Sequence, residues 1–308
     1  MMDFTALLNK LLVFLVLMVI GYVMARRGKL DRGSIKVMSS LTMNIFLTGS
    51  ILNSTLGASV ELSWSELGRI FLVVWVMQIL GYVIAWLVAR LMPVDRAHKP
   101  LFELLMSMGN SMFVALPIVD ALFPGSHAVF YVSLSCLPFN VLLFTYGVWR
   151  LQSGKENAQF RFRNIFSIPL LAALAALILF LVKPPLPKAV TGLISTLAGA
   201  TTPMSMLVIG ASLGTVSLLD AFKNGKLYVA SAVRLLLIPV LTWLLLRLLT
   251  DDPVLLMTMT IVAGSPAAVV ITVLANQYDL DPVYPAEGTL QSTALSMLTI
   301  PLLVWILG

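Results

Sequence analysis

Long apolar stretches separated by short polar turns constrain this chain more than any other feature of its sequence. A helix needs about 20 mostly apolar residues to cross a bilayer, because unpaired backbone groups are too costly in lipid. The sequence therefore predicts an all-α integral membrane protein with ten transmembrane helices and no soluble domain. Their approximate bounds are residues 4–25, 34–56, 67–92, 99–123, 127–150, 165–182, 188–214, 226–249, 253–277 and 284–307.

Composition agrees with this interpretation. The chain of 308 residues is 59% hydrophobic and 11% charged, whereas a soluble domain carries about 25% charged residues. The first stretch lacks a preceding basic region and a small-residue cleavage site, so we expect a retained span rather than a signal peptide. Cys136 is the one cysteine, which excludes an intramolecular disulfide and any multi-cysteine metal site.

The distribution of basic residues predicts the topology. Most of the 20 Lys and Arg residues fall in the odd-numbered loops; the even-numbered loops hold Arg69, Lys183, Lys188 and Arg247. Because basic loops stay in the cytoplasm, both termini are expected on the extracytoplasmic side of a plasma membrane. The net charge of +6 then reflects topology and gives no reason to expect a nucleic-acid partner.

The polar connection 152–163 divides the chain into two five-helix sets, residues 1–151 and 164–308. Because five is odd, the second set enters the membrane from the opposite side, and two related sets would be inverted repeats. The second and seventh spans support this pairing. Thr48-Gly49-Ser50 is expected to interrupt one span, and Thr201-Thr202-Pro203 the other.

Spans four and nine each carry a proline beside small polar residues, about half the chain length apart. The first segment runs from Gly109-Asn110-Ser111 to Pro117, and the second reads Gly264-Ser265-Pro266-Ala267-Ala268. Gly264 is expected to end a helix in a left-handed conformation, Ser265 to cap a new helix and Pro266 to begin it. Interrupted helices at equivalent places in two repeats indicate a transporter's substrate site. The alternative is that both prolines only kink their helices.

The expected crossing of these two breaks is uncharged. No Asp, Glu, Lys, Arg or His lies between Leu104 and Val119 or between Pro253 and Tyr278. Half-helix N-termini carry positive dipole ends, which suit an anion such as a carboxylate. We therefore predict a substrate site without metal or cofactor. Its predicted residues are Asn110, Ser111, Asn140, Thr202, Ser265, Ala267 and Ala268.

Ionisable groups inside spans are expensive in lipid and usually functional. Arg234 in span eight either supports the site electrostatically or extends its charged end towards water, and the sequence leaves both open. Glu103, Asp120 and Glu287 lie near predicted helix ends, where interfacial or capping roles are expected and proton relay stays an alternative. Interhelical hydrogen bonds are expected for the other polar residues, Asn44, Asn53, Gln291, Ser292 and Thr293.

The ordered set of these motifs resembles the auxin efflux carrier family, which includes plant auxin carriers and bacterial malonate and malate permeases. The resemblance covers essentially the whole chain. It is carried by the two breaks, by Ala275-Asn276-Gln277-Tyr278-Asp279-Leu280-Asp281 and by Ser296-Met297-Leu298-Thr299-Ile300-Pro301.

The resemblance implies two inverted five-helix repeats with crossing helices four and nine, as in bile-acid symporters and sodium–proton antiporters. Spans one, two, six and seven would form a scaffold; spans three to five and eight to ten would form a moving transport domain. It also implies a homodimer, substrate contact by Asn110 and a proline pair at Pro117 and Pro266. Thr48, where the family often has proline, and Ser135, where plant members use glutamine, favour a bacterial-type carrier over an auxin carrier.

The leading prediction is a secondary transporter of small organic anions, such as malate or malonate, working by elevator-type alternating access. Coupling to protons or to sodium is left open. An intramembrane enzyme would need a nucleophile–base pair or metal ligands in a span, and the sequence has neither pattern. A sodium-coupled bile-acid-type symporter and a receptor of the same fold that does not transport its ligand remain alternatives.

Overall fold

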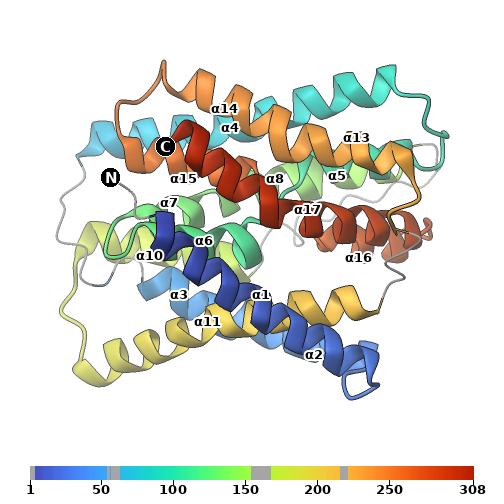
Figure 1. Cartoon of the computed structure of the whole chain (residues 1–308). Helices are drawn as coiled ribbons and strands as arrows, with labels where there is room; N and C mark the ends of the chain where they lie inside the picture. Colours follow the sequence, from blue (N-terminus) through green and yellow to red (C-terminus); the bar gives the residue numbers. More distant parts are fainter. Residues whose placement is uncertain (1–3, 54–55, 57–62, 154–167, 216–220) are drawn as a thin grey trace. The chain divides into compact units, whose positions relative to one another are not determined.

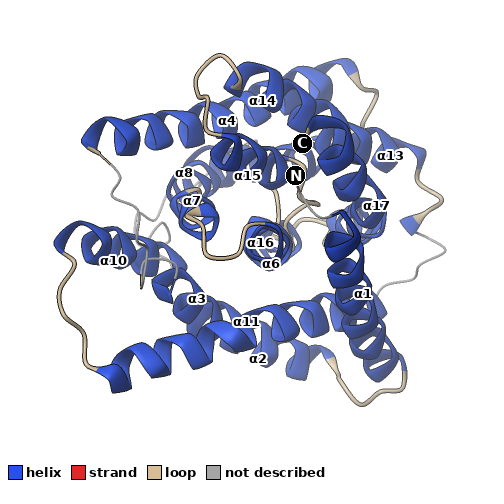
Figure 2. Cartoon of the chain, turned by 60° about the vertical axis from the view of Figure 1, so that its left-hand side comes forward, coloured by secondary structure: helices blue, strands red, loops and turns tan. Residues whose placement is uncertain are grey.

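The computed structural model describes residues 4–53, 56, 63–153, 168–215 and 221–308. Figure 2 shows helices and loops, and no strand, in this part of the chain. The helices of the first half are α1 Phe4–Arg26, α2 Arg32–Leu41, η1 Thr42–Phe46, α3 Leu47–Asn53, α4 Trp64–Leu91, α5 Lys99–Ser107, η2 Ser111–Ala115, α6 Leu116–Leu122, α7 Ala128–Leu134, α8 Cys136–Leu142, η3 Leu143–Gly147 and α9 Val148–Leu151. Those of the second half are α10 Ile168–Val182, α11 Lys188–Gly214, α13 Gly225–Ala232, η5 Val233–Leu237, α14 Ile238–Leu246, α15 Pro253–Ala263, α16 Val270–Gln277 and α17 Val283–Leu307.

Six helical stretches among the described residues are long and apolar enough to cross a membrane. They span residues 32–53, 64–91, 128–151, 188–214, 225–246 and 283–307. Other apolar helices are shorter, including Ser111–Leu122 of span four and Pro253–Ala263 of span nine. The chain is thus a nearly all-helical, multi-pass membrane protein, while ten spans and an inverted repeat stay predictions.

Local sequence explains where several helices begin. Ser63 and Glu66 form a reciprocal cap at the start of α4: the Ser63 N–H donates to Glu66 Oε2 (2.6 Å) and the Glu66 N–H to Ser63 Oγ (3.3 Å). Asp252 accepts from the N–H groups of Val254 and Leu255, and Pro253 occupies the first turn of α15.

Two compact units can be described separately. Unit 1 contains Met1–Gly68, Met112–Cys136 and Ser167–Thr215; unit 2 contains Arg69–Ser111, Leu137–Phe166 and Val216–Gly308. The predicted scaffold and transport domain, and the predicted repeats 1–151 and 164–308, stay predictions. Of the predicted linker 152–163, residues 154–163 lie outside the described residues.

Unit 1 is built on close helix packing at small residues. Helix α11 packs along α1 and α3 (Figure 1). A Cβ atom on Gly210 would overlap the Met18 carbonyl group of α1, and one on Gly49 would overlap the Leu197 side chain of α11. Small residues allow such backbone approach between membrane helices, where lipid gives no hydrophobic driving force for association.

The expected interruption of spans two and seven is wrong. Residues 47–53 form helix α3, and α11 continues through Pro203. In place of a break, Gly49 provides close contact between the helices, and the Thr201 hydroxyl donates to the Phe46 carbonyl oxygen at 2.7 Å. The small and polar residues at these positions serve packing.

Unit 2 contains α5, the first half of span four, and α15 and α16, the two halves of span nine, packed against α13, η5, α14 and α17. Gly288 of α17 lies against Leu105 of α5 and Leu227 of α13. The expected interhelical bond of Gln291 is confirmed, because its Oε1 accepts from the Ser231 hydroxyl at 3.2 Å. In the same unit, the π-helical turn η5 precedes Pro239, whose missing N–H removes a helical hydrogen bond.

Candidate functional site

Both spans predicted to be broken are unwound in the structure. Helix α5 ends at Ser107, and the chain becomes helical again at Ser111. Helix α15 ends at Ala263, and α16 begins at Val270. We call the two non-helical segments, residues 108–110 and 264–269, the paired breaks.

Backbone hydrogen bonds join the paired breaks. The Asn110 N–H donates to the Pro266 carbonyl oxygen at 2.7 Å, and the Ala268 N–H donates to the Met108 carbonyl oxygen at 3.0 Å. Gly109 therefore lies opposite Ala267 in an antiparallel bridge. The Ala267 N–H donates to the Ser292 hydroxyl of α17 at 3.1 Å. Backbone groups released by unwinding thus find partners inside the protein, as a membrane interior requires.

The expected local geometry of the second break is wrong in three respects. Gly264 has φ −87° and ψ 4°, which is not the left-handed conformation. The Ser265 hydroxyl donates to the Val262 carbonyl oxygen (2.7 Å) instead of capping a new helix. Pro266 does not begin a helix, because residues 266–268 pair with the other break and the next helix starts at Val270.

Arg234 holds the ends of both interrupted helices. It is 4% exposed, which excludes the alternative in which its charge reaches water. Its Nε donates to the Ser265 carbonyl oxygen at 2.8 Å, and Nη1 donates to the Ser107 carbonyl oxygen at 3.2 Å. Its further acceptors are the carbonyl oxygens of Met106 (3.4 Å) and Val262 (3.2 Å) and the Ser265 hydroxyl (3.1 Å).

These acceptors explain why a cation is stable in this position. The last carbonyl groups of a helix have no partner within it and form the negative end of its dipole. Helices α5 and α15 both end here, so one guanidinium satisfies orphan carbonyls from two helices. Gly109 permits the arrangement, because a Cβ atom there would overlap the Arg234 guanidinium and the Ser265 hydroxyl.

Asn110 and Ser111 have polar side chains that are nearly buried, 8% and 7% exposed. Among the described residues, neither side chain has a hydrogen-bond partner. Ser111 also begins a helical stretch that continues to Leu122, so its backbone N–H belongs to a helix start with no acceptor inside that helix. An amide and a hydroxyl group are thus available beside the paired breaks.

The remaining predicted site residues fall in both units. Ala267 and Ala268 are buried in the second break, and Asn140 is buried on α8 in unit 2. Thr202 lies on α11 and Pro117 at the start of α6, both in unit 1. Their roles, like those of Asn110 and Ser111, stay predictions. Among the described residues, no group of three or more His, Cys, Asp or Glu side chains is placed to hold a metal ion.

Gln78 of α4 is a residue that the sequence argument missed. It is buried, and its Nε2 donates to the Ser107 carbonyl oxygen at 3.4 Å, an oxygen that Arg234 also contacts. The sequence does show a single amide within the apolar span three. Because polar groups inside spans are costly unless paired, it could have been predicted to have a hydrogen-bond partner.

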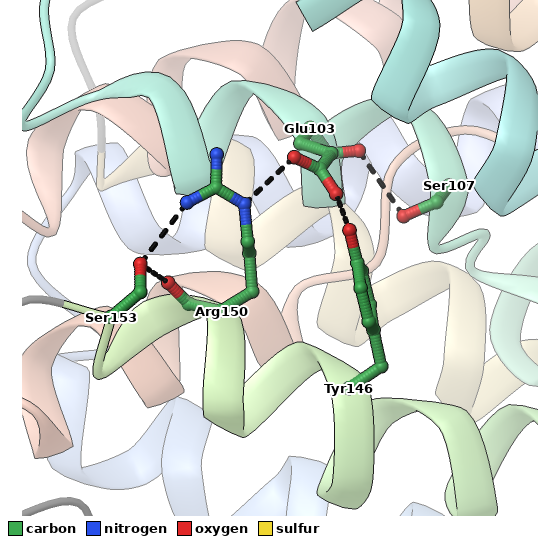
Figure 3. Close-up of polar contacts among 5 residues, drawn as sticks. All are labelled: Glu103, Ser107, Tyr146, Arg150 and Ser153. Carbon is green, nitrogen blue, oxygen red and sulfur yellow. Dashed lines mark hydrogen bonds and ion pairs between the residues drawn. The ribbon is translucent and has the colours of Figure 1, made fainter.

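Glu103 was expected near an interface, but it is 1% exposed. Figure 3 shows its carboxylate between Arg150 and Tyr146. The Arg150 Nε donates to Glu103 Oε2 at 2.9 Å, the Tyr146 hydroxyl donates to Oε1, and Arg150 Nη1 donates to the Ser153 hydroxyl at 3.1 Å. The buried charge is therefore paired, and its neighbours come from η3 and α9.

Comparisons with known proteins identify the family. The sequence profile of a family described as "membrane transport protein" matches residues 6–304. A protein of Methanothermobacter thermautotrophicus, named an uncharacterized transporter, is 27% identical over 293 residues, covering 94% of each chain. A Methanocaldococcus jannaschii protein with the same description is 24% identical over 311 residues, covering 97% of this chain and 98% of its own. The chain therefore belongs to the membrane transport protein family, the auxin efflux carrier-like family that its motifs resemble, and is a transporter rather than an enzyme.

Proposed function

We propose that the chain is a secondary transporter of small organic anions, mono- or dicarboxylates such as malate or malonate, in a plasma membrane. The observation that carries this proposal is the pair of unpartnered side chains, Asn110 and Ser111, beside the paired breaks. Their polar atoms are not fully enclosed, so a ligand can reach them. A carboxylate accepts hydrogen bonds from both an amide and a hydroxyl group, and such bonds to a charged group contribute about 1.5–3 kcal/mol each.

The electrostatics of the segment favour an anion over a cation. No ionisable residue lies between Leu104 and Val119 or between Pro253 and Tyr278, so a carboxylate meets no fixed negative charge there. Helix starts at Ser111 and Val270 contribute positive dipole ends. The negative ends of α5 and α15 are already occupied by Arg234.

Arg234 also bears on the coupling ion. In transporters with broken helices, unwound carbonyl groups and half-helix C-terminal ends often coordinate sodium. Here the carbonyl oxygens of Ser107, Val262 and Ser265 accept hydrogen bonds from a guanidinium group. A built-in cation in this place favours transport without sodium over the sodium-coupled bile-acid-type alternative.

Alternating access would move the two broken spans past a scaffold, as the family resemblance implies, in a homodimer whose termini are extracytoplasmic. A fixed Arg234 charge would move in both directions and cancel over a cycle. Transport of an anion without a coupled proton would therefore be electrogenic. Moving one elementary charge through 100 mV corresponds to about 2.3 kcal/mol, so uptake should respond to the membrane potential.

A flux assay tests the proposal directly. Purified protein in liposomes should take up labelled malate, malonate or a related acid with saturation, and equally in sodium and in choline buffer. Asn110→Ala should reduce saturable uptake at least about tenfold, since it removes a hydrogen bond to a charged group. Asn44→Ala, the same substitution at a half-buried residue of η1 in unit 1, is the control and should transport normally.

A receptor that binds its ligand without moving it is the second candidate, and the same preparation separates the two. Carboxylates that raise the melting temperature of the wild-type protein, without any uptake into liposomes, would favour the receptor. Absence of both binding and uptake across a broad set of acids would contradict the organic-anion proposal.

A further inference from the structure

A cavity outside the paired breaks has no role in the transport proposal. It has a volume of about 290 Å³ and lies within unit 2, between the last turns of α4, the start of α5 and the η3–α9 segment. Its lining residues are Trp86, Ala89, Arg90, Lys99, Glu103, Tyr146, Trp149 and Arg150.

The cavity carries an excess of positive charge. Arg150 and Glu103 form an ion pair at 2.9 Å, so these two charges compensate each other (Figure 3). Arg90 stacks over the Trp86 ring, with 4.1 Å between the guanidinium carbon and the ring centroid. Within the described part of the chain, neither Arg90 nor Lys99 forms an ion pair. Two cations therefore face the cavity without a counter-ion.

The position of the cavity is that of a membrane–water interface. Arg90 belongs to the last turn of the membrane-spanning helix α4, and Lys99 is the first residue of α5. Trp86 and Trp149 are 37% and 59% exposed, and tryptophan is enriched where acyl chains meet headgroups. Leu87 and Leu91, on the same end of α4, are exposed apolar residues that an acyl chain could cover.

We propose that this cavity binds the phosphate headgroup of an anionic phospholipid. Basic pockets between membrane helices bind such headgroups, and the Coulomb attraction adds to burial of the adjacent acyl chain. Arg90 and Lys99 would pair with the phosphate, while Trp86 and Trp149 would contact the glycerol region. Arg150 compensates the charge of Glu103, and the Tyr146 hydroxyl donates to its other oxygen, so the carboxylate repels the phosphate only weakly. The lipid is a ligand distinct from the transported substrate.

Native mass spectrometry of the full chain tests this proposal. Protein extracted from nanodiscs of equal parts phosphatidylglycerol and phosphatidylcholine should retain phosphatidylglycerol preferentially. Arg90→Gln combined with Lys99→Gln should lower the ratio of retained phosphatidylglycerol to phosphatidylcholine by roughly thirtyfold, because two interfacial cations are lost. The control, Arg27→Gln combined with Lys29→Gln, removes the same charge from an exposed turn of unit 1 and should keep the wild-type ratio.

A single variant and a displacement experiment distinguish lipid binding from misfolding and from binding of soluble anions. If the double variant does not fold, Lys99→Gln alone should give a smaller loss in the same direction. Inorganic phosphate or malonate at millimolar concentration should not displace the retained lipid; displacement would identify a site for soluble anions and overturn the proposal. Equal retention of the two lipids by the wild-type protein, or an unchanged ratio in a folded double variant, would also overturn it.

Discussion

Two pairs of segments in this chain are both predicted from their small and polar residues to be interrupted, and they fold differently. Spans four and nine unwind at Gly109 and Gly264, and their backbones bond to each other. Spans two and seven also contain glycine, threonine and serine, and span seven has Pro203, yet residues 47–53 and 188–214 stay helical. Glycine and proline therefore do not by themselves unwind a membrane helix in this protein.

The two pairs of spans differ in whether other protein groups form hydrogen bonds with the backbone groups that unwinding would release. At the paired breaks, Asn110 and Ala268 donate N–H groups across the bridge, and Arg234 satisfies carbonyl groups at two helix ends. At the other pair, Gly49 serves close packing and Thr201 donates to an existing helix carbonyl. An unwound segment in lipid persists only where protein groups replace its lost hydrogen bonds. Four substitutions test this comparison, from the largest expected effect to the smallest.

Replacing the cation should have the largest effect. Arg234→Met leaves the carbonyl groups of Ser107, Val262 and Ser265 without this donor, so stability should fall by roughly 3 kcal/mol or more. Thermal unfolding in detergent measures the loss, and Arg234→Lys should recover part of it. Arg69→Met at an exposed position is the control. An unchanged melting temperature in Arg234→Met would contradict the role of Arg234.

Adding a side chain at the first break should have the second largest effect. Gly109→Ala places a Cβ atom on the Arg234 guanidinium, and such overpacking costs about 1–3 kcal/mol. We expect a lower melting temperature and reduced uptake. Gly199→Ala, in α11 where a Cβ atom meets nothing within 4 Å, should be neutral or stabilising by up to about 1 kcal/mol. Equal effects of the two substitutions would show that the break tolerates a side chain.

The hydrogen bond between α11 and η1 of unit 1 should contribute less to stability than Arg234 or Gly109. Thr201→Val removes the hydroxyl that donates to the Phe46 carbonyl oxygen at 2.7 Å, and such bonds in membrane proteins average about 0.6 kcal/mol. Thr196→Val loses only a bond within its own helix, to the Gly192 carbonyl oxygen at 2.8 Å. A small melting shift for Thr201→Val, above that for Thr196→Val, is expected. A loss of stability as large as that of Arg234→Met would mean that the packing of spans two and seven also depends on a single hydrogen bond.

The smallest effect should come from Pro203→Ala. Helix α11 is already continuous through Pro203, and alanine restores a backbone N–H to the helix, so the substitution should cause no loss of stability and leave uptake intact. Circular dichroism and the flux assay measure the two quantities. A strong loss of uptake would show that Pro203 sets a functional bend that the helical geometry does not reveal.

The sequence was sufficient for the membrane class, the transporter family and the positions of both helix breaks. A membrane span can be recognised as about 20 apolar residues because lipid forces the backbone to form its hydrogen bonds within a helix. Gly109 and Gly264 mark the places where the two helices end. Arg234 was identified as an ionisable group inside a span, although the sequence left two interpretations open. Its contact with both helix ends depends on residues 28 to 128 positions away.

Other features could not be predicted because they depend on long-range pairing. The conformation at Gly264 follows from bonds between residues 108–110 and 266–268, which local capping rules do not include. Glu103 looked interfacial because its partners, Tyr146 and Arg150, lie more than 40 positions away. Thr201 and Gly49 looked like break residues because close packing and unwinding both use small and polar side chains.

The central claim is that Asn110, within the first of the paired breaks, contacts the carboxylate of the substrate. Uptake of labelled malonate by liposomes containing Asn110→Asp tests it most directly, because the change is nearly isosteric and adds one negative charge. A like charge within a few Å of the substrate costs several kcal/mol, so uptake at neutral pH should fall at least about tenfold. Asn224→Asp, where either residue can cap helix α13, should transport like the wild-type protein. Equal uptake by Asn110→Asp and the wild-type protein would contradict the claim.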